Sequence, residues 1–251
     1  MSDTDWLPLF PLQTVLFPGG VLPLKVFETR YVDMVRERMK RNAPFGVVAI
    51  RSGNEVGDAA EPWLVGTLAH IVEWDMPELG VLLLQTRGGD RFRVLEKRVQ
   101  PSQLIEARIE LLPATESVVT DDALTVCANV LRIVIDDLLE QAREQAGNSF
   151  INPFPEPHQL SAPGWVANRW SEMLPITLEQ KQALLEMTDN GDRLLKVEQY
   201  LRENGVSEGG LRPIRAPHNL LQALSSPYKP PSNFFTGAGS GALDKAATGR
   251  H

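Results

Sequence analysis

The sequence predicts an α+β protein in which a β-rich unit precedes a helical unit. Apolar residues alternate or form short runs up to Glu116, and then recur at three- and four-residue spacing. Short strands with only one early helix among them favour a closed or nearly closed β-structure over a doubly wound sheet. We therefore expect a β-rich unit at residues 1–117, a helical bundle at 118–205 and a flexible Gly/Pro-rich tail at 206–251.

The N-terminal stretch is apolar but interrupted by proline. The prolines are Pro8, Pro11, Pro18 and Pro23. Because proline fixes φ and lacks an N–H donor, no segment here can be a helix interior or a central strand along its whole length. Short strands at residues 7–12 and 21–27 are expected, joined by a sharp turn at Pro18-Gly19-Gly20.

One helix and further strands follow this stretch. Helical spacing of apolar residues predicts a helix over residues 28–40. The expected strands are residues 45–51, 64–75, 79–86, 91–99 and 104–112. The Gly88-Gly89 pair predicts a tight hairpin turn between two of them. In the last strand, alternation predicts that the apolar side chains face inward; these are Ile105, Ala107, Ile109 and Leu111.

The part of the chain after Glu116 predicts helices. These are residues 120–146, residues 162–173, a stretch that begins near Pro175 and residues 192–203. Thr177 and Gln180 have the spacing of a capping box at the start of the third helix. We expect these helices to form a small bundle docked on the β-rich unit.

Several of these segments resemble one family. The N-terminal segments 9–12, 15–19, 22–24 and 27–31 match its opening pattern, and segments near residues 45–50, 65–71, 88–96, 174–186 and 192–198 follow in its order. Over about residues 6–203, the chain therefore resembles a stand-alone Lon protease N-terminal (substrate-binding) domain, a fold also found in cereblon-like proteins. The resemblance implies a PUA-like pseudo β-barrel followed by helices.

Composition excludes some functions and disfavours others. The chain has 25 Lys and Arg against 32 Asp and Glu, and its net charge of −7 disfavours nucleic-acid binding. Cys127 is the only cysteine, so no disulfide framework is expected. No apolar run reaches the roughly 18 residues that span a bilayer. The N-terminus is acidic where a secretory signal is basic, so we expect a cytoplasmic protein without a membrane segment.

Sequence patterns that carry chemistry are mostly missing. No phosphate-binding loop of the G-x-x-x-x-G-K-[ST] type occurs, and the ATPase and Ser-Lys protease modules of full-length Lon are not found. The segment 237–242 has the glycine spacing of a dinucleotide-binding fingerprint. Because no strand is expected before it, we do not expect it to bind a dinucleotide. No two histidines have the spacing of metal ligands on one expected element, and no cysteine pair accompanies them; the histidines are His70, His158, His218 and His251. We therefore expect no cofactor, no metal and no enzymatic activity.

Large apolar side chains lie at the Pro-Gly turn, in the Pro-rich connector at residues 150–157 and at element ends, where we expect no regular element to cover them fully. They predict a peptide-binding site on the seam between barrel and bundle. Its candidate residues are Phe17, Leu22, Phe150, Phe154 and Trp165. The alternative is that these side chains simply fill the seam.

The resemblance implies a non-enzymatic protein- or peptide-binding module. The Lon N-terminal domain engages unfolded or degron-bearing polypeptide, so a free-standing copy would bind such segments or a protein partner. It would then act as an adaptor or regulator in protein quality control. Two alternatives stay open: an RNA-binding module, because PUA-like folds often bind RNA, and an enzyme with an unrecognised site. The client and the oligomeric state are not specified by the sequence.

Overall fold

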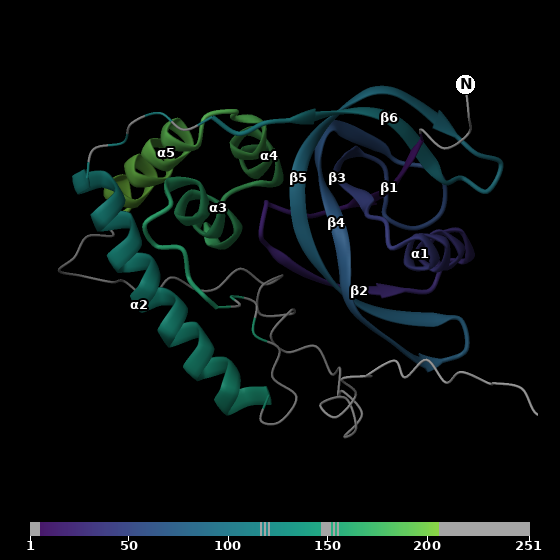
Figure 1. The fold of residues 1–251 in the computed structure, drawn as a ribbon, viewed down its shortest axis with the longest axis horizontal. Helices are drawn as coiled ribbons and strands as arrows, with labels where there is room; N and C mark the ends of the chain where they lie inside the picture. Colours follow the sequence, from purple (N-terminus) through teal and green to yellow (C-terminus); the bar gives the residue numbers. More distant parts are fainter. Residues whose placement is uncertain are drawn as a thin grey trace, which may run out of the picture.

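A body of strands lies beside a group of helices in the computed structural model, which describes residues 6–115, 117, 119, 121–146, 152, 154 and 156–205 (Figure 1). The strands are β1 (Leu7–Leu12), β2 (Val21–Val26), β3 (Phe45–Ser52), β4 (Glu61–Glu78), β5 (Val81–Val99) and β6 (Ile105–Leu112). The helices are α1 (Thr29–Arg41), α2 (Asp121–Ala146), α3 (Pro163–Met173), α4 (Leu178–Glu186) and α5 (Asn190–Glu203). The predicted α+β class is confirmed, and the predicted tail lies outside the described residues.

The strands close into a ring. The sheet runs in the order β2-β5-β4-β3-β1-β6, and β5 also pairs with β6. Because β5 is long, its second half closes the ring against β6 while its first half pairs with β2. The strands β5, β4, β3, β1 and β6 therefore form the predicted pseudo-barrel, and β2 is an edge strand added beside it.

The prolines of β1 and β2 lie where the sheet tolerates them. β1 pairs with β6 over Leu7–Leu9 and in parallel with β3 over residues 9–12. Pro8 therefore has a neighbour only in β6, and Pro11 only in β3. Pro23 lies in β2, at the edge of the sheet. At each position a missing N–H donor leaves at most one ladder incomplete, as the sequence predicted.

β5 runs without a break through Gly88 and Gly89, so the predicted hairpin turn there is wrong. A Cβ on Gly88 would lie 2.3 Å from the Phe17 carbonyl oxygen, and one on Gly89 would lie 2.7 Å from His70 Nε2. These glycines therefore permit close approach of neighbouring chain segments. The turn between β4 and β5 is at Leu79-Gly80, where Gly80 has a φ of +87°.

The inward alternation predicted for β6 holds only in its first part. Ile105 and Ala107 are buried, but Leu111 is 52% exposed. β6 ends at Leu112, so Leu111 lies at the end of the strand, where the ring no longer covers it.

The helices divide their packing between two cores. α2, α3 and α5 surround the buried Trp170, whose Nε1 donates to the Cys127 carbonyl at 3.0 Å. α4 instead packs on the barrel, because Leu185 joins a cluster with Val15 and Val65. The expected bundle is therefore built from α2, α3 and α5, and α4 lies between it and the strands. The Thr177–Gln180 capping box at the start of α4 is confirmed.

Candidate functional site

The connection between β1 and β2 docks on α3. The Pro18 carbonyl accepts hydrogen bonds from Arg169 Nη2 at 3.0 Å and from Asn168 Nδ2 at 3.4 Å. Gly19 has a φ of +77°, and a Cβ on Gly20 would lie 2.2 Å from Glu172 Oε1. The predicted Pro-Gly-Gly turn is thus one point at which the barrel meets the helices, on the side facing α3 in Figure 1.

A buried group of charges supports this docking turn. Arg169 and Glu172 form an ion pair of 2.6 Å, and Lys181 Nζ donates to the Glu172 carbonyl at 2.7 Å. Burial raises the pKa of Glu172, and the Arg169 charge opposes that shift. Burial also lowers the pKa of Lys181. Because each charge is held by partners within the fold, we assign the group a structural role.

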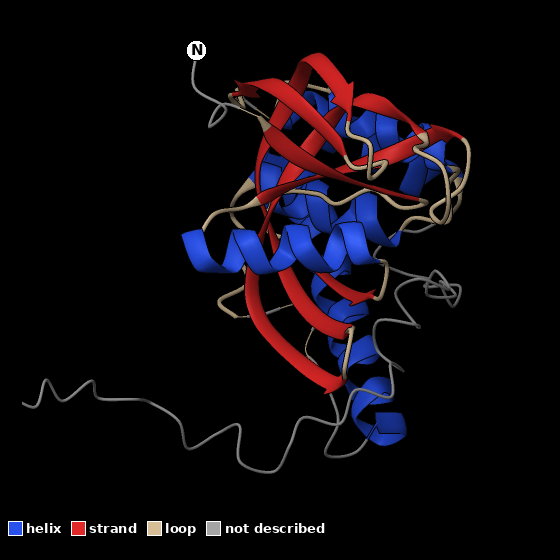
Figure 2. Cartoon of the chain, turned by 90° about the vertical axis from the view of Figure 1, so that its right-hand side faces the viewer, coloured by secondary structure: helices blue, strands red, loops and turns tan. Residues whose placement is uncertain are grey.

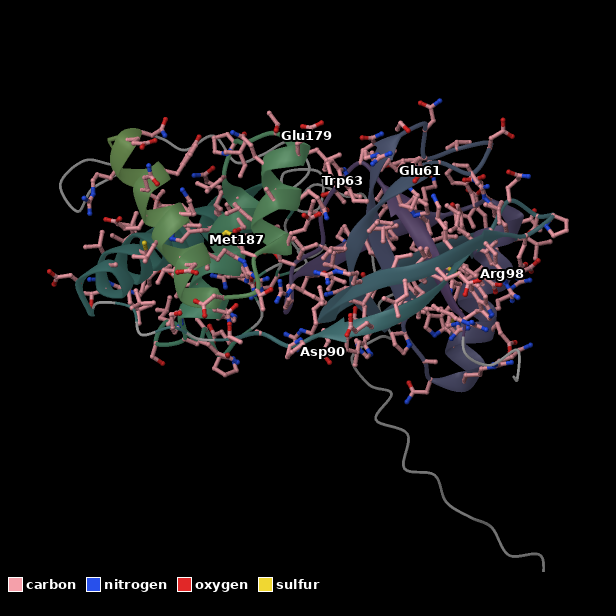
Figure 3. All side chains as sticks on the ribbon, turned by 90° about the horizontal axis from the view of Figure 1, so that it is seen from above. Glu61, Trp63, Asp90, Arg98, Glu179 and Met187 are labelled. Carbon is pink, nitrogen blue, oxygen red and sulfur yellow. The ribbon has the colours of Figure 1, made fainter. Side chains whose placement is uncertain are left out.

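Phe17 fills the seam between barrel and helices. Its side chain is 0% exposed and packs with Val65 and Leu185 in the cluster that joins the strands to α4. Trp63 lies at the margin of this cluster; seen from above, Trp63 and Glu179 mark its barrel and helix sides (Figure 3). The expectation that a Pro-Gly turn leaves Phe17 incompletely covered is therefore wrong, because α4 covers it.

Phe154 belongs to the helical core and not to the seam. It is 1% exposed and packs among side chains of α2, α3 and α5. Its N–H donates to Asn152 Oδ1 at 2.8 Å, and His158 Nε2 lies 2.9 Å from its carbonyl oxygen. The expectation that a loop position leaves this ring uncovered is also wrong. Phe150 lies outside the described residues.

Trp165 and Leu22 are the accessible members of the predicted site. Both are partly buried. The Trp165 ring lies 5.7 Å from the His158 ring and 5.8 Å from the Arg169 guanidinium carbon. Arg169 therefore connects Trp165 to the Pro18 turn next to Phe17, whereas Leu22 packs against the core that α1 forms with the barrel. Peptide binding at the seam stays a prediction.

A more exposed apolar surface lies at the far end of β4. Its residues are Val72, Trp74, Met76 and Leu79, all of them exposed. They follow Ala69, the last residue of β4 that pairs with β3. In Figure 2, α1 crosses the front of the molecule and strands extend below it. A strand was expected up to residue 75, but the sequence did not reveal that β3 begins only opposite Ala69 and so does not cover the rest of β4.

The geometry of the described residues bears on metal binding and on thiol chemistry. No group of three or more His, Cys, Asp or Glu side chains among them is placed to hold a metal ion. Cys127 is fully buried, and burial raises the pKa of its thiol to about 12, so it is not a thiolate nucleophile. No helix in the described part of the chain is long and apolar enough to cross a membrane.

The ring of strands with docked helices is the fold of Lon N-terminal domains. A crystal structure of a Lon N-terminal domain protein from Xanthomonas campestris matches it with a TM-score of 0.59 and 30% identity, over 78% of this chain and 98% of that one. The model of the ATP-dependent protease La (LON) substrate-binding domain matches residues 6–203. The chain therefore belongs to the LON substrate-binding domain family.

Two relatives show how far the similarity extends. The Lon protease of Anaeromyxobacter dehalogenans is 30% identical over 199 residues, which is 78% of this chain but 23% of that protein. Protein cereblon of Gallus gallus is 31% identical over 111 residues, which is 43% of this chain and 24% of cereblon. The chain thus spans about a quarter of the length of these relatives.

Proposed function

We propose that this chain recognises polypeptide segments that carry accessible apolar side chains. The observation that supports the proposal best is the exposed apolar surface at the end of β4, where Trp74 is 47% exposed and Leu79 is 93% exposed. Four exposed large apolar side chains within eight residues of chain differ from the singly scattered ones that are normal on a protein surface, and groups of this kind are typical of interaction sites. Tryptophan is also among the residues that contribute most to binding when an interface covers them.

The family supports the same proposal, because its model describes a substrate-binding domain. In this proposal the chain works as an interaction module in the cytoplasm, without a cofactor, as an adaptor or regulator in protein quality control. Its partner is an unfolded or degron-bearing polypeptide or another protein. The acidic side chains Glu73, Asp75 and Glu78 beside the exposed apolar residues argue against the RNA-binding alternative, since they repel phosphate.

A binding titration tests the proposal. The probe is fluorescently labelled ribonuclease A, either native or reduced and alkylated with a neutral group so that it stays unfolded. We expect saturable binding of the unfolded form and none of the native form. A labelled RNA oligonucleotide measured at several salt concentrations tests the alternative. Equal binding of both protein forms, or binding of RNA alone, would contradict the proposal.

Two substitutions locate the surface. Leu79→Ser removes an exposed apolar side chain from the turn after β4. Leu95→Ser is the matched control, because Leu95 is 63% exposed but lies in the second half of β5. We expect the first to weaken binding of the unfolded probe several-fold and the second to leave it unchanged. The reverse order would place the binding surface elsewhere.

A further inference from the structure

The free edge of β4 adds a backbone element to this surface. β4 pairs with β5 up to Glu78, but its pairing with β3 stops at Ala69. On its outer side, residues 70–78 have no strand partner in the described part of the chain. An edge strand of this kind presents unpaired N–H and C=O groups that can accept another extended segment.

The side chain of Trp74 lies in line with buried side chains of the neighbouring strands. Leu24 pairs with Leu84, and Leu84 pairs with Trp74, so these side chains share one face of the sheet. Leu24 and Leu84 are buried, whereas Trp74 is about half exposed. An added strand that placed an apolar side chain beside Trp74 would therefore extend an existing apolar row.

Acidic side chains flank Trp74 on the opposite face. Glu73 pairs with Gln85, and Asp75 pairs with Leu83. Asp75 Oδ1 accepts a hydrogen bond from the Met76 N–H at 2.8 Å, which fixes the carboxylate at the edge. Two carboxylates on either side of an apolar ring favour a partner with Lys or Arg on either side of an apolar residue.

Irregular pairing limits the length of the site. The register of β4 on β5 shifts between Ile71 and Glu73 and again between Asp75 and Glu78. The regular stretch is therefore Glu73–Trp74–Asp75, and Pro77 lacks a donor beyond it. A short regular edge suits a short segment, and its negative charge disfavours pairing with the same edge of a second copy.

We propose that Glu73, Trp74 and Asp75 form a strand-addition site for a short extended polypeptide segment in which apolar residues alternate with Lys or Arg. The proposal rests on the proposed function, since it names the sequence class and the binding mode of the same surface. It assigns the apolar contact to Trp74 and the charge preference to Glu73 and Asp75.

Three blocked peptides of equal length test the sequence preference. The first has the centre Lys-Ile-Lys-Ile-Lys, the second has the same residues as Ile-Ile-Lys-Lys-Lys, and the third replaces Lys by Glu. We expect the first to bind about tenfold more tightly than either of the others. Equal dissociation constants for all three peptides would overturn the proposal.

Backbone methylation of the first peptide tests the binding mode. In strand addition, alternate N–H groups of the added segment point at the edge. N-methylation of one alternate set should therefore abolish binding, while methylation of the other set should be tolerated. Equal tolerance of both sets would show docking by side chains alone and would overturn strand addition.

Reversing the charge of Glu73 and Asp75 tests their role in the charge preference. The double variant Glu73→Lys/Asp75→Lys should lose roughly tenfold for the Lys peptide and should prefer the Glu peptide. Asp136→Lys/Glu140→Lys is the matched control, because it makes the same change of charge at exposed positions of α2. An equal loss in both double variants would overturn the site, since it would report net charge only.

The unfolded probe separates the two proposals. If the protein binds unfolded ribonuclease A but shows no preference among the peptides, the edge site is wrong and the proposed function stands. If it does not bind the unfolded probe at all, the proposed function is wrong.

Discussion

Asp189 joins two segments of the chain through the three hydrogen bonds that its carboxylate accepts. Oδ1 accepts from the Asp192 N–H at 3.0 Å and so caps α5, while Oδ2 accepts from Thr115 Oγ1 and from the Ser117 N–H, each at 2.9 Å. These hydrogen bonds favour the ionised form, with the Asp192 N–H contributing most, and they lower the pKa of Asp189 to about 2. The start of α5 is thereby held to the segment that follows β6.

The lowered pKa predicts how this stabilisation depends on pH. It is fully present above the unfolded pKa of about 3.9 and is lost as the pH falls through the folded pKa. Asp189→Asn should therefore lower the melting temperature at neutral pH, and its difference from the original chain should be mostly lost by about pH 2. Thermal unfolding across this range measures it, with the exposed Asp137→Asn on α2 as control. A difference that persists at low pH would contradict the prediction.

Phe154 carries a prediction about stability. Because its ring is 1% exposed in the helical core, Phe154→Ala should lower the free energy of unfolding by about 3–5 kcal/mol. Affinity for unfolded polypeptide, per folded molecule, should not change. Chemical denaturation and the binding titration measure the two quantities on the same variant. Phe27→Ala, at a position 55% exposed, is the control for loss of a phenyl ring. A loss of affinity without a loss of stability would contradict this prediction and would indicate that Phe154 contacts the bound polypeptide.

At the scale of elements, two arginines bind the end of α4. Arg91 of β5 donates to the carbonyls of Leu185 at 2.7 Å and Met187 at 2.6 Å. Arg193 of α5 donates to the Leu184 carbonyl at 2.7 Å and also to that of Met187. Burial lowers the pKa of both guanidinium groups. The last carbonyls of a helix lack partners within it and attract positive charge, so these contacts hold α4 between barrel and bundle.

Removing one of these arginines should loosen α4. Arg91→Met leaves buried carbonyls without a donor, and we expect a loss of about 3 kcal/mol in the free energy of unfolding. Urea denaturation measures it, with the exposed Arg87→Met on the same strand as control. Hydrogen exchange at α4 should increase more than at β3. A loss no larger than that of the control would show that water replaces the guanidinium.

At the scale of the whole molecule, barrel and helices share a core. Phe17, Val65 and Leu185 pack together across the seam, and this cluster brings a strand and a helix distant in sequence into one buried group. The cluster is apolar, so its separation would expose hydrophobic area on both sides. We infer that the barrel and the helices unfold together.

Phe17→Ala tests this inference. It should lower the melting temperature by several degrees while calorimetry still shows one transition, because the shared core couples both parts. Far-UV circular dichroism and tryptophan fluorescence should report the same midpoint. Two resolved transitions in the original chain would show that the parts unfold independently.

Local patterns predicted most elements, and interactions distant in sequence account for the misses. Period and capping residues placed α2 to α5, and the Thr177 capping box was found because its partners lie three residues apart. The role of Gly88 depends on the Phe17 carbonyl, which no local pattern connects to it. The cover over Phe17 comes from α4, and the open edge of β4 exists because β3 begins opposite Ala69. Local sequence patterns therefore locate most elements, but they do not show which surfaces these elements leave open.

The arginine contacts at α4 have a consequence for variation among relatives. Arg91 and Arg193 bind main-chain oxygens of residues 184, 185 and 187 and not their side chains. Every amino acid supplies the same carbonyl, so these contacts survive substitution at the receiving positions but not at the arginines, since lysine lacks the planar fork. In an alignment of homologues, position 187 should therefore vary in residue type, while positions 91 and 193 should remain arginine.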